Sequence, residues 1–144
     1  MVLSDKWFST MGETDNGTPI FITGRDNIEA FRLSGKLKER VEIYWSYTPT
    51  HNAMPSEEDG KLMDEVQTAL RHAVEKDKLA ILTGVYVGDG ERTMVFYTRT
   101  SRVFGERLNE ALAPFPTLPI KLYAEIDPEW NEYNEMCEIR PFAE

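Results

Sequence analysis

The chain has 144 residues, of which 41% are hydrophobic and 28% are charged. This balance is that of an ordinary globular domain and excludes a disordered chain. One domain of this length needs no disulfide or metal to be stable. The formal net charge of −9 argues against nucleic acid as a ligand, because nucleic-acid binding depends on clustered Lys and Arg. It is compatible with a basic protein partner.

Cysteine usage and the N-terminal sequence bear on the cellular compartment. Cys137 is the single cysteine, so no intrachain disulfide can form, which suits a reducing environment. Residues 1–20 carry Asp5, Glu13 and Asp15 and have no long apolar stretch, so we expect no signal peptide. No run approaches the ~20 apolar residues of a membrane helix. The sequence therefore predicts a cytoplasmic domain without membrane contact.

The first predicted element is a β-hairpin over residues 6–23. Residues 6–11 and 19–23 are rich in aromatic and β-branched side chains, as strands are. Between them, Asp15-Asn16-Gly17 is a strong turn signal, because Asn-Gly tolerates the positive φ angles of tight turns.

Segment 25–36 has a less regular pattern. It is compatible with a short helix that Asp26 caps and that Ser34-Gly35 ends. The inward side chains of that helix would be Ile28, Phe31 and Leu33.

The central part of the chain begins with a strand and a long helix. Residues 39–48 alternate, with Val41, Ile43, Trp45 and Tyr47 on one face and Glu42, Tyr44, Ser46 and Thr48 on the other. This alternation predicts a strand with one buried face. After loop 49–55, Ser56 is a natural N-cap, and apolar residues at helical spacing predict a helix over 57–76.

Four further elements follow in order. Residues 79–87 are apolar nearly throughout and predict a central strand, which turns at 88–90 and returns as an antiparallel strand over 92–98. Ser101 can cap a helix over 101–113, which the prolines at 114, 116 and 119 end. An alternating run then predicts a last strand over 120–126.

From residue 39 onward the predicted order is strand, helix, strand, strand, helix, strand. This is the order of the ferredoxin-like, or split βαβ, arrangement: an α+β fold in which two helices lie on one face of an antiparallel sheet. The N-terminal hairpin 6–23 would extend that sheet or pack beside it. We therefore expect one domain over 1–144, with a core at about 39–126 and a C-terminal capping segment at 127–144.

The sequence gives little support for catalysis or metal binding. His51 and His72 have no Cys or His at metal-ligand spacing, and zinc sites need three or four convergent ligands. Cys137 has acidic neighbours, which oppose the lowered pKa that a reactive thiol needs. Serine-hydrolase motifs and a phosphate-binding loop are absent. We predict no catalytic residue, no cofactor and no metal, and an enzyme is the less favoured class.

The C-terminal segment allows three interpretations. Asp127 can cap a helix with Pro128 at its first position, and that helix would fold Trp130 and Tyr133 back over the sheet edge. Alternatively, an acidic surface with aromatic residues recognises a basic partner, since Trp and Tyr are frequent at interface centres. That surface would consist of Asp127, Glu129, Trp130, Glu132 and Tyr133. The third possibility is a ligand pocket lined by Trp130, Tyr133 and Tyr123.

Taken together, several of these segments resemble one bacterial family, number 695 among the domains of unknown function. They are Trp7 followed by Asp15-x-Gly17-x-Pro19, the strand Val41-Glu42-Ile43, the long capped helix, the hairpin around 88–92 with Tyr97, and the ending Asp127-Pro128-x-Trp130-x-x-Tyr133. Members of that family are sometimes joined to a ferredoxin-like domain similar to the protein regulator of an RNA-turnover endoribonuclease, and that domain is not apparent here. The resemblance implies no catalytic residue.

The sequence thus favours a non-catalytic bacterial module that acts through protein contacts, as an interaction or regulatory domain. The alternative is a small-molecule-binding domain or an undetected hydrolase, with a cleft between the sheet and loop 49–55. A deep pocket with converging polar groups would favour the alternative.

Overall fold

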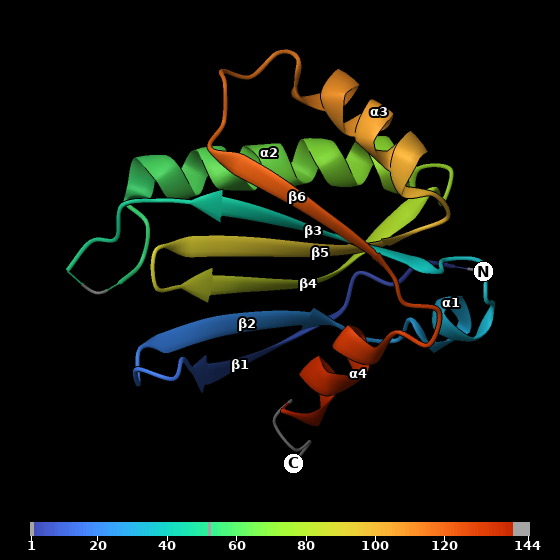
Figure 1. The fold of residues 1–144 in the computed structure, drawn as a ribbon, viewed down its shortest axis with the longest axis horizontal. Helices are drawn as coiled ribbons and strands as arrows, with labels where there is room; N and C mark the ends of the chain where they lie inside the picture. The colour runs from blue at the N-terminus through green and yellow to red at the C-terminus, as the bar shows by residue number, and fades with distance from the viewer. Residues whose placement is uncertain (1, 52, 140–144) are drawn as a thin grey trace.

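A computed structural model describes residues 2–51 and 53–139, which form one six-stranded antiparallel sheet and four helices (Figure 1). Residue 52 of the predicted loop and residues 140–144 of the predicted C-terminal segment lie outside the described residues. The strands are β1 (Trp7–Glu13), β2 (Pro19–Arg25), β3 (Glu39–Ser46), β4 (Ala80–Gly88), β5 (Glu91–Thr98) and β6 (Ile120–Ile126). The helices are α1 (Glu29–Leu33), α2 (Glu57–Glu75), α3 (Ser101–Leu112) and α4 (Asn131–Glu138).

The N-terminal hairpin is part of the sheet rather than a separate layer. β1 pairs with β2, and β2 pairs in turn with β4, so the strand order is β1-β2-β4-β5-β3-β6. Gly17 supplies the positive φ of 78° that the hairpin turn requires. The open sheet therefore has more strands than the predicted four-stranded core, because the hairpin adds two at one edge.

One face of the sheet is covered by α2 and α3, as the alternation in the sequence predicts. Val41, Ile43 and Trp45 are buried there and pack with the buried face of α2. The Ser56 side chain caps α2 by accepting a hydrogen bond of 3.1 Å from the Asp59 amide.

The predicted N-caps of α1 and α3 are wrong. Thr100, not Ser101, is the N-cap residue of α3, and the Ser101 hydroxyl instead donates to Glu39 Oε1 at 2.8 Å. Ile28, not Asp26, precedes α1, and its side chain makes no capping bond. Gly35 has a φ of 69° just beyond α1, which agrees with the predicted end of that helix.

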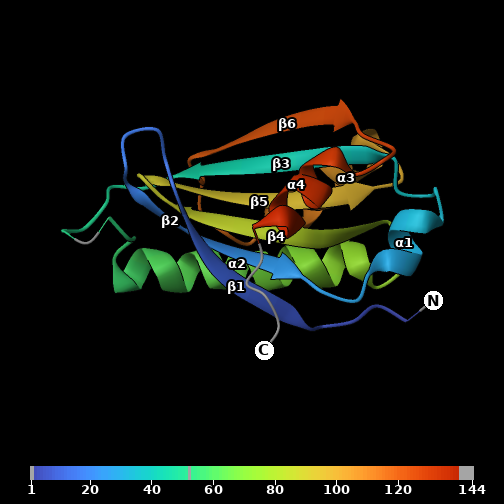
Figure 2. The ribbon, with the colours of Figure 1, turned by 90° about the horizontal axis from the view of Figure 1, so that it is seen from below.

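The opposite face of the sheet is also covered, by α4 and α1 (Figure 2). The C-terminal helix folds Trp130 and Tyr133 back onto the sheet as predicted, but it covers the middle of a face and not the edge. β4 and β5 are apolar on both faces, and Ile81, Val95 and Tyr97 are fully buried beneath the second layer. A second cover is needed because these side chains would otherwise be exposed to water. The buried members of this second core are Ile22, Ile28, Phe31, Leu37, Ile81, Val95, Tyr97, Trp130, Tyr133 and Met136.

Two glycines let α4 approach the sheet closely. A Cβ atom at Gly84 would lie 2.7 Å from the sulfur of Met136, and one at Gly24 would lie 2.8 Å from Met136 Cε. Both distances are shorter than carbon and sulfur atoms tolerate, so Met136 occupies the space that the missing side chains leave. Gly24 of β2 and Gly84 of β4 therefore help to determine where α4 packs on this face.

Candidate functional site

The candidate site lies on the face that carries α4 and begins at Arg40 in β3. The guanidinium of Arg40 contacts three carboxylates. Its Nε atom donates to Glu42 Oε2 at 2.9 Å, its Nη1 atom donates to Asp127 Oδ2 at 2.7 Å, and its Nη2 atom pairs with Glu125. These residues come from β3, β6 and the turn after β6. We call Arg40, Glu42, Tyr97, Glu125 and Asp127 the Arg40 cluster.

Asp127 joins this cluster to the start of α4. Its carboxylate accepts hydrogen bonds from the Tyr97 hydroxyl at 2.7 Å and from the Asn131 amide at 2.9 Å, in addition to the bond from Arg40. Burial by itself would raise the pKa of Asp127, but the hydrogen bonds from Asn131, Tyr97 and Arg40 outweigh it and hold that pKa below its ordinary value. The carboxylate of Asp127 therefore stays ionised at the positive end of α4.

The Asp127 carboxylate accepts hydrogen bonds from the first amides of α4, as predicted for a capping group, but the N-cap residue is Trp130 and the predicted start of the helix is wrong. α4 begins at Asn131, whereas the sequence placed Pro128 at its first position. Trp130 intervenes with a φ of 58° in the left-handed region, which is unusual for a residue with a side chain. The turn through Trp130 lets the Asp127 carboxylate reach the first free amides of the helix.

Trp130 is buried, and its contacts explain how that turn is held. Its indole Nε1 atom donates to the carbonyl of Leu37 at 2.8 Å. Its ring stacks on Tyr97, with 4.4 Å between ring centroids, and meets Tyr133 edge-on at 5.5 Å. Trp130 therefore belongs to the second core and cannot form part of an exposed interface.

The other four residues of the predicted interaction surface differ in how far they are buried. Tyr133 is buried, and its hydroxyl donates to the carbonyl of Arg25 at 2.5 Å. Asp127 is buried, Glu132 is half-buried and Glu129 is exposed. The predicted interaction surface is therefore wrong for Trp130 and Tyr133, because the rings of these two residues complete a core.

Glu132, in the first turn of α4, is the carboxylate near the Arg40 cluster whose pKa is shifted most. Its Oε1 atom accepts a hydrogen bond of 2.5 Å from the Tyr86 hydroxyl, while its Oε2 atom is buried without a partner among the described residues. Burial raises the pKa of Glu132 to about 7. The negative charges of Glu42 and Asp127 add to this rise, whereas the bond from Tyr86 and the charge of Arg40 oppose it.

Beyond α4 the sheet presents a partly exposed surface of tyrosines and glutamates. Figure 2 shows α4 across the middle of the sheet, with β3, β5 and β6 uncovered toward the β4–β5 turn. The Tyr44 hydroxyl donates to Glu42 Oε1 at 2.9 Å. Burial and this carboxylate raise the pKa of Tyr44 to about 12. We call Glu42, Tyr44, Tyr86, Tyr123 and Glu132 the tyrosine–glutamate face.

Sequence reasoning identified part of this surface. The alternation over 39–48 correctly placed Glu42 and Tyr44 together on the face opposite the buried apolar residues. Arg40 and Tyr86 were missed. Arg40 meets Asp127 across 87 positions of sequence, and the β3–β6 register alone brings them together. The uninterrupted apolar run of β5 was the available signal that both sheet faces are covered.

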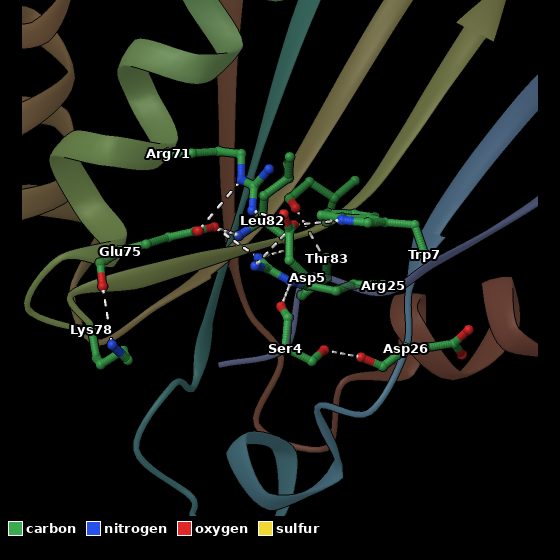
Figure 3. A network of polar contacts seen from close by, with 11 residues as sticks. Ser4, Asp5, Trp7, Arg25, Asp26, Arg71, Glu75, Lys78, Leu82 and Thr83 are labelled. Atoms are coloured by element: carbon green, nitrogen blue, oxygen red, sulfur yellow. Dashed lines mark hydrogen bonds and ion pairs between the residues drawn. The ribbon is translucent and has the colours of Figure 1, made fainter. Parts of the chain in front are cut away.

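Another arginine, the buried Arg25 at the end of β2, forms a separate cluster (Figure 3). Its Nη1 atom donates to Glu75 Oε2 at 2.9 Å and to the Leu82 carbonyl at 3.0 Å, and its Nε atom donates to the Ser4 carbonyl at 2.8 Å. The guanidinium also lies 4.8 Å from the centre of the Trp7 ring. We call Ser4, Asp5, Trp7, Arg25, Arg71, Glu75 and Leu82 the Arg25 cluster, and its contacts fasten the N-terminal segment to α2.

The region near loop 49–55 holds a shallow depression of about 830 Å³. It is lined by Pro55, Ser56 and the outer residues of α2, whose polar side chains face solvent. His51 and His72 are exposed, and Cys137 is half-buried. Within residues 2–51 and 53–139, no group of three or more His, Cys, Asp or Glu side chains is arranged to hold a metal.

These features define an α+β domain in which one antiparallel sheet carries a different layer on each face. Residues 5–136 match the model described as "Family of unknown function (DUF695)". The chain belongs to that family, and the resemblance carried by its motifs is confirmed. No curated protein and no solved structure gives a significant match to the chain. In the part of the chain that the structure describes, no helix is long and apolar enough to cross a membrane.

Proposed function

We propose that this domain is a non-catalytic protein-interaction or regulatory module, and that it binds a basic segment of a partner protein on the tyrosine–glutamate face. The observation that carries the proposal is the composition of this partly exposed surface. Three tyrosines and two glutamates from β3, β4, β6 and α4 lie on one face, and Tyr123 is 46% exposed.

The chemistry of the face suits Lys and Arg side chains. Tyrosine rings attract cations placed over their faces, and carboxylates form charge-assisted hydrogen bonds with them. The Arg40 cluster places three carboxylates around one guanidinium, so this region has an excess of negative charge. The same excess repels nucleic-acid phosphates. Tyrosine is also enriched at protein interfaces, where it contributes apolar area and a polar group.

We infer that residues 39–126 have the ferredoxin-like arrangement within a single domain. The elements follow one another as β3-α2-β4-β5-α3-β6, the four strands lie in the order β4-β5-β3-β6, and each neighbouring pair is antiparallel. α2 and α3 pack on one face of these strands. A cytoplasmic location in bacteria is part of the same proposal and is supported by the single cysteine.

A small-molecule or hydrolase function has less support. The depression near loop 49–55 is open, and its polar side chains come from the solvent-facing side of α2. A binding pocket normally buries most of a ligand and directs a few polar groups toward it. Glu132 has a pKa suited to proton transfer, but it lies on the opposite face of the sheet from this depression.

The test uses two synthetic peptides of equal length, one rich in Lys and Arg and one rich in Glu, with the amide NMR spectrum of the full chain as the readout. The proposal expects the basic peptide to shift amides of β3, β6 and the start of α4, and the acidic peptide to shift none. The absence of any shift, or shifts confined to α2, would show that the proposal is wrong.

Two double variants, of which the control removes one carboxylate more than the site variant, separate a specific site from general attraction. Glu132→Gln combined with Tyr123→Ala alters the proposed face, whereas Glu58→Gln combined with Glu65→Gln removes two exposed charges from α2. The first variant should weaken binding of the basic peptide at least tenfold, and the second by less than about threefold, because separated surface charges are screened by salt. Equal losses would contradict a defined site.

A further inference from the structure

The strand β6 forms one border of the sheet, and its outer edge is uncovered. β6 is the last strand in the sheet order, and in Figure 2 no segment of the described residues lies beyond it. Its side chains are exposed to a degree unusual for an apolar strand, with Leu122 at 46%, Tyr123 at 46% and Ile126 at 75%. Natural proteins usually protect such an edge with proline, a bulge or a covering segment, since it otherwise pairs with another strand.

The backbone of β6 has a regular set of groups directed outward. The Ser46 amide donates to the Pro119 carbonyl at 3.2 Å, and the Asp127 amide donates to the Lys38 carbonyl at 2.7 Å. In an antiparallel pair, hydrogen-bonded and non-bonded positions alternate. Odd-numbered residues of β6 therefore bond to β3, and the even-numbered residues Leu122, Ala124 and Ile126 direct their N–H and C=O groups toward the open edge.

The side chains of β6 are complementary to those of a second β6 strand. When two copies pair antiparallel about Tyr123, Leu122 of one copy lies opposite Ala124 of the other, and Ile120 lies opposite Ile126. On the other face, Lys121 lies opposite Glu125. Both sets of pairs match, apolar with apolar and cation with carboxylate, and opposite charges in such cross-strand pairs are stabilising. The same register pairs residues whose backbone groups both point outward.

The other border of the sheet lacks this property. Glu13 is the one charged residue of β1, so two copies of β1 offer no pair of opposite charges. Trp7 of β1 is also engaged, because it lies against the guanidinium groups of Arg25 and Arg71. The two edges of the same sheet therefore differ in what they can bind.

We propose that β6 is a homodimerisation edge, at which a second copy of this chain adds its own β6 antiparallel about Tyr123 and joins the two sheets into one. This pairing buries the exposed apolar side chains of β6 and satisfies its outward backbone groups. It is independent of the proposed binding of a basic partner, although it brings the two tyrosine–glutamate faces onto the same side of the joined sheet.

The experiment measures the mass of the full chain in solution by sedimentation velocity over a concentration series. The expected species has twice the mass of the 16.6 kDa chain. Ala124→Pro removes one outward N–H group without affecting the ladder to β3, and proline is tolerated on edge strands. It should raise the dimer Kd at least tenfold with an unchanged circular dichroism spectrum. Ser9→Pro on β1 is the matched control and should leave the dimer intact.

Charge reversal tests the register itself. Lys121→Glu and Glu125→Lys each place like charges opposite one another in a homodimer, so each variant alone should dimerise several-fold more weakly. An equimolar mixture of the two variants restores opposite charges at both positions and should form a heterodimer as readily as the natural chain does. A natural chain that stays monomeric at NMR concentrations would overturn the proposal and leave the edge to a strand of another protein. Loss of the dimer with Ser9→Pro rather than Ala124→Pro would overturn it as well.

Discussion

Arg25 and Arg40 each anchor a cluster of ion pairs, and the two clusters differ in their balance of charge. In the Arg25 cluster, the two cations Arg25 and Arg71 pair with the two carboxylates of Asp5 and Glu75. In the Arg40 cluster, one guanidinium is surrounded by three carboxylates. The first cluster is neutral overall, and the second retains an excess of negative charge.

This difference indicates which cluster is structural and which is available to a partner. The contacts of Arg25 join the N-terminal segment, β2 and α2, and its side chain is 2% exposed. The side chain of Arg40 is 12% exposed, and one of its partners, Glu125, is 51% exposed. A neutral, enclosed ion pair stabilises the fold, whereas an acidic one at the rim of an open sheet face attracts a cation.

Replacing Arg25 is the most direct way to test the structural half of this comparison. Arg25→Ala leaves the half-buried Glu75 with Arg71, at 3.4 Å, as its remaining cation partner, and two backbone carbonyls lose their donor. We expect a loss of about 3–5 kcal/mol in the free energy of unfolding, because removing one side of a buried pair is strongly destabilising. Urea denaturation measures this. Arg102→Ala, which breaks an exposed pair with Glu106, should cost no more than about 0.5 kcal/mol.

Trp130 tests whether the C-terminal layer is part of the core. Trp130→Ala removes the ring stacked on Tyr97 and the hydrogen bond to the Leu37 carbonyl. We expect a loss of about 3–5 kcal/mol, as for other large aromatic truncations in cores. Thermal denaturation followed by near-ultraviolet circular dichroism measures it. A nearly unchanged melting temperature would instead place Trp130 on the surface.

Asp127 belongs to the acidic Arg40 cluster and also holds the start of α4, which covers the second core. Asp127→Ala removes the partner of Arg40 and Tyr97 and the cap of α4, and we expect a loss of about 2–3 kcal/mol at neutral pH. The pKa of Asp127 is lowered in the fold. Its stabilising contribution is therefore present above its ordinary value of 3.8 and is lost as the pH falls below that value. Urea midpoints at pH 7 and pH 3 should differ less in the variant than in the natural chain.

The local elements of this fold could be predicted from the sequence, whereas the second layer could not. Alternation located β3, and helical spacing with the Ser56 cap located α2 to within one residue of its observed end. The residue types of the tail allowed both a core and an interface, because Trp130 and Tyr133 suit either, and the structure supports the core interpretation. The apolar second face of β4 and β5 decides in favour of the core, because it must be covered. The pattern of these strands alone does not say which helix covers it.

The candidate site could not be predicted from the sequence, for a related reason. Arg40, Tyr97 and Asp127 belong to separate elements, and their contact requires the order β5-β3-β6 as well as the correct register. Tyr86 and Glu132 meet across the gap between β4 and α4. Such contacts depend on how elements pack, and no spacing in the sequence records them.

Glu132 offers a prediction opposite in sign to that for Asp127. Its pKa is raised from 4.5 to about 7, so the fold favours its protonated form. The stability that this gives is present below pH 4.5 and is lost as the pH rises through 7. Glu132→Gln keeps the shape without the charge, so it should be more stable than the natural chain at pH 8, by about 1–2 kcal/mol, and similar to it at pH 4.5. Urea denaturation at both pH values measures the difference, and Glu58→Gln should show none.

The same residue gives the smallest and most specific test of the acidic face. A cation bound beside Glu132 favours the ionised form of its carboxyl group. A basic peptide without histidine should therefore bind more tightly as the pH rises. Raising the pH from 6 to 8 should lower the peptide Kd by up to about tenfold for a carboxyl that titrates near 7, as measured by titration calorimetry. Glu132→Gln should remove this pH dependence, whereas Arg71→Lys in the neutral Arg25 cluster should preserve it. If the natural chain binds with one affinity at both pH values, Glu132 is not coupled to the bound cation, and the excess charge of the Arg40 cluster acts at a distance.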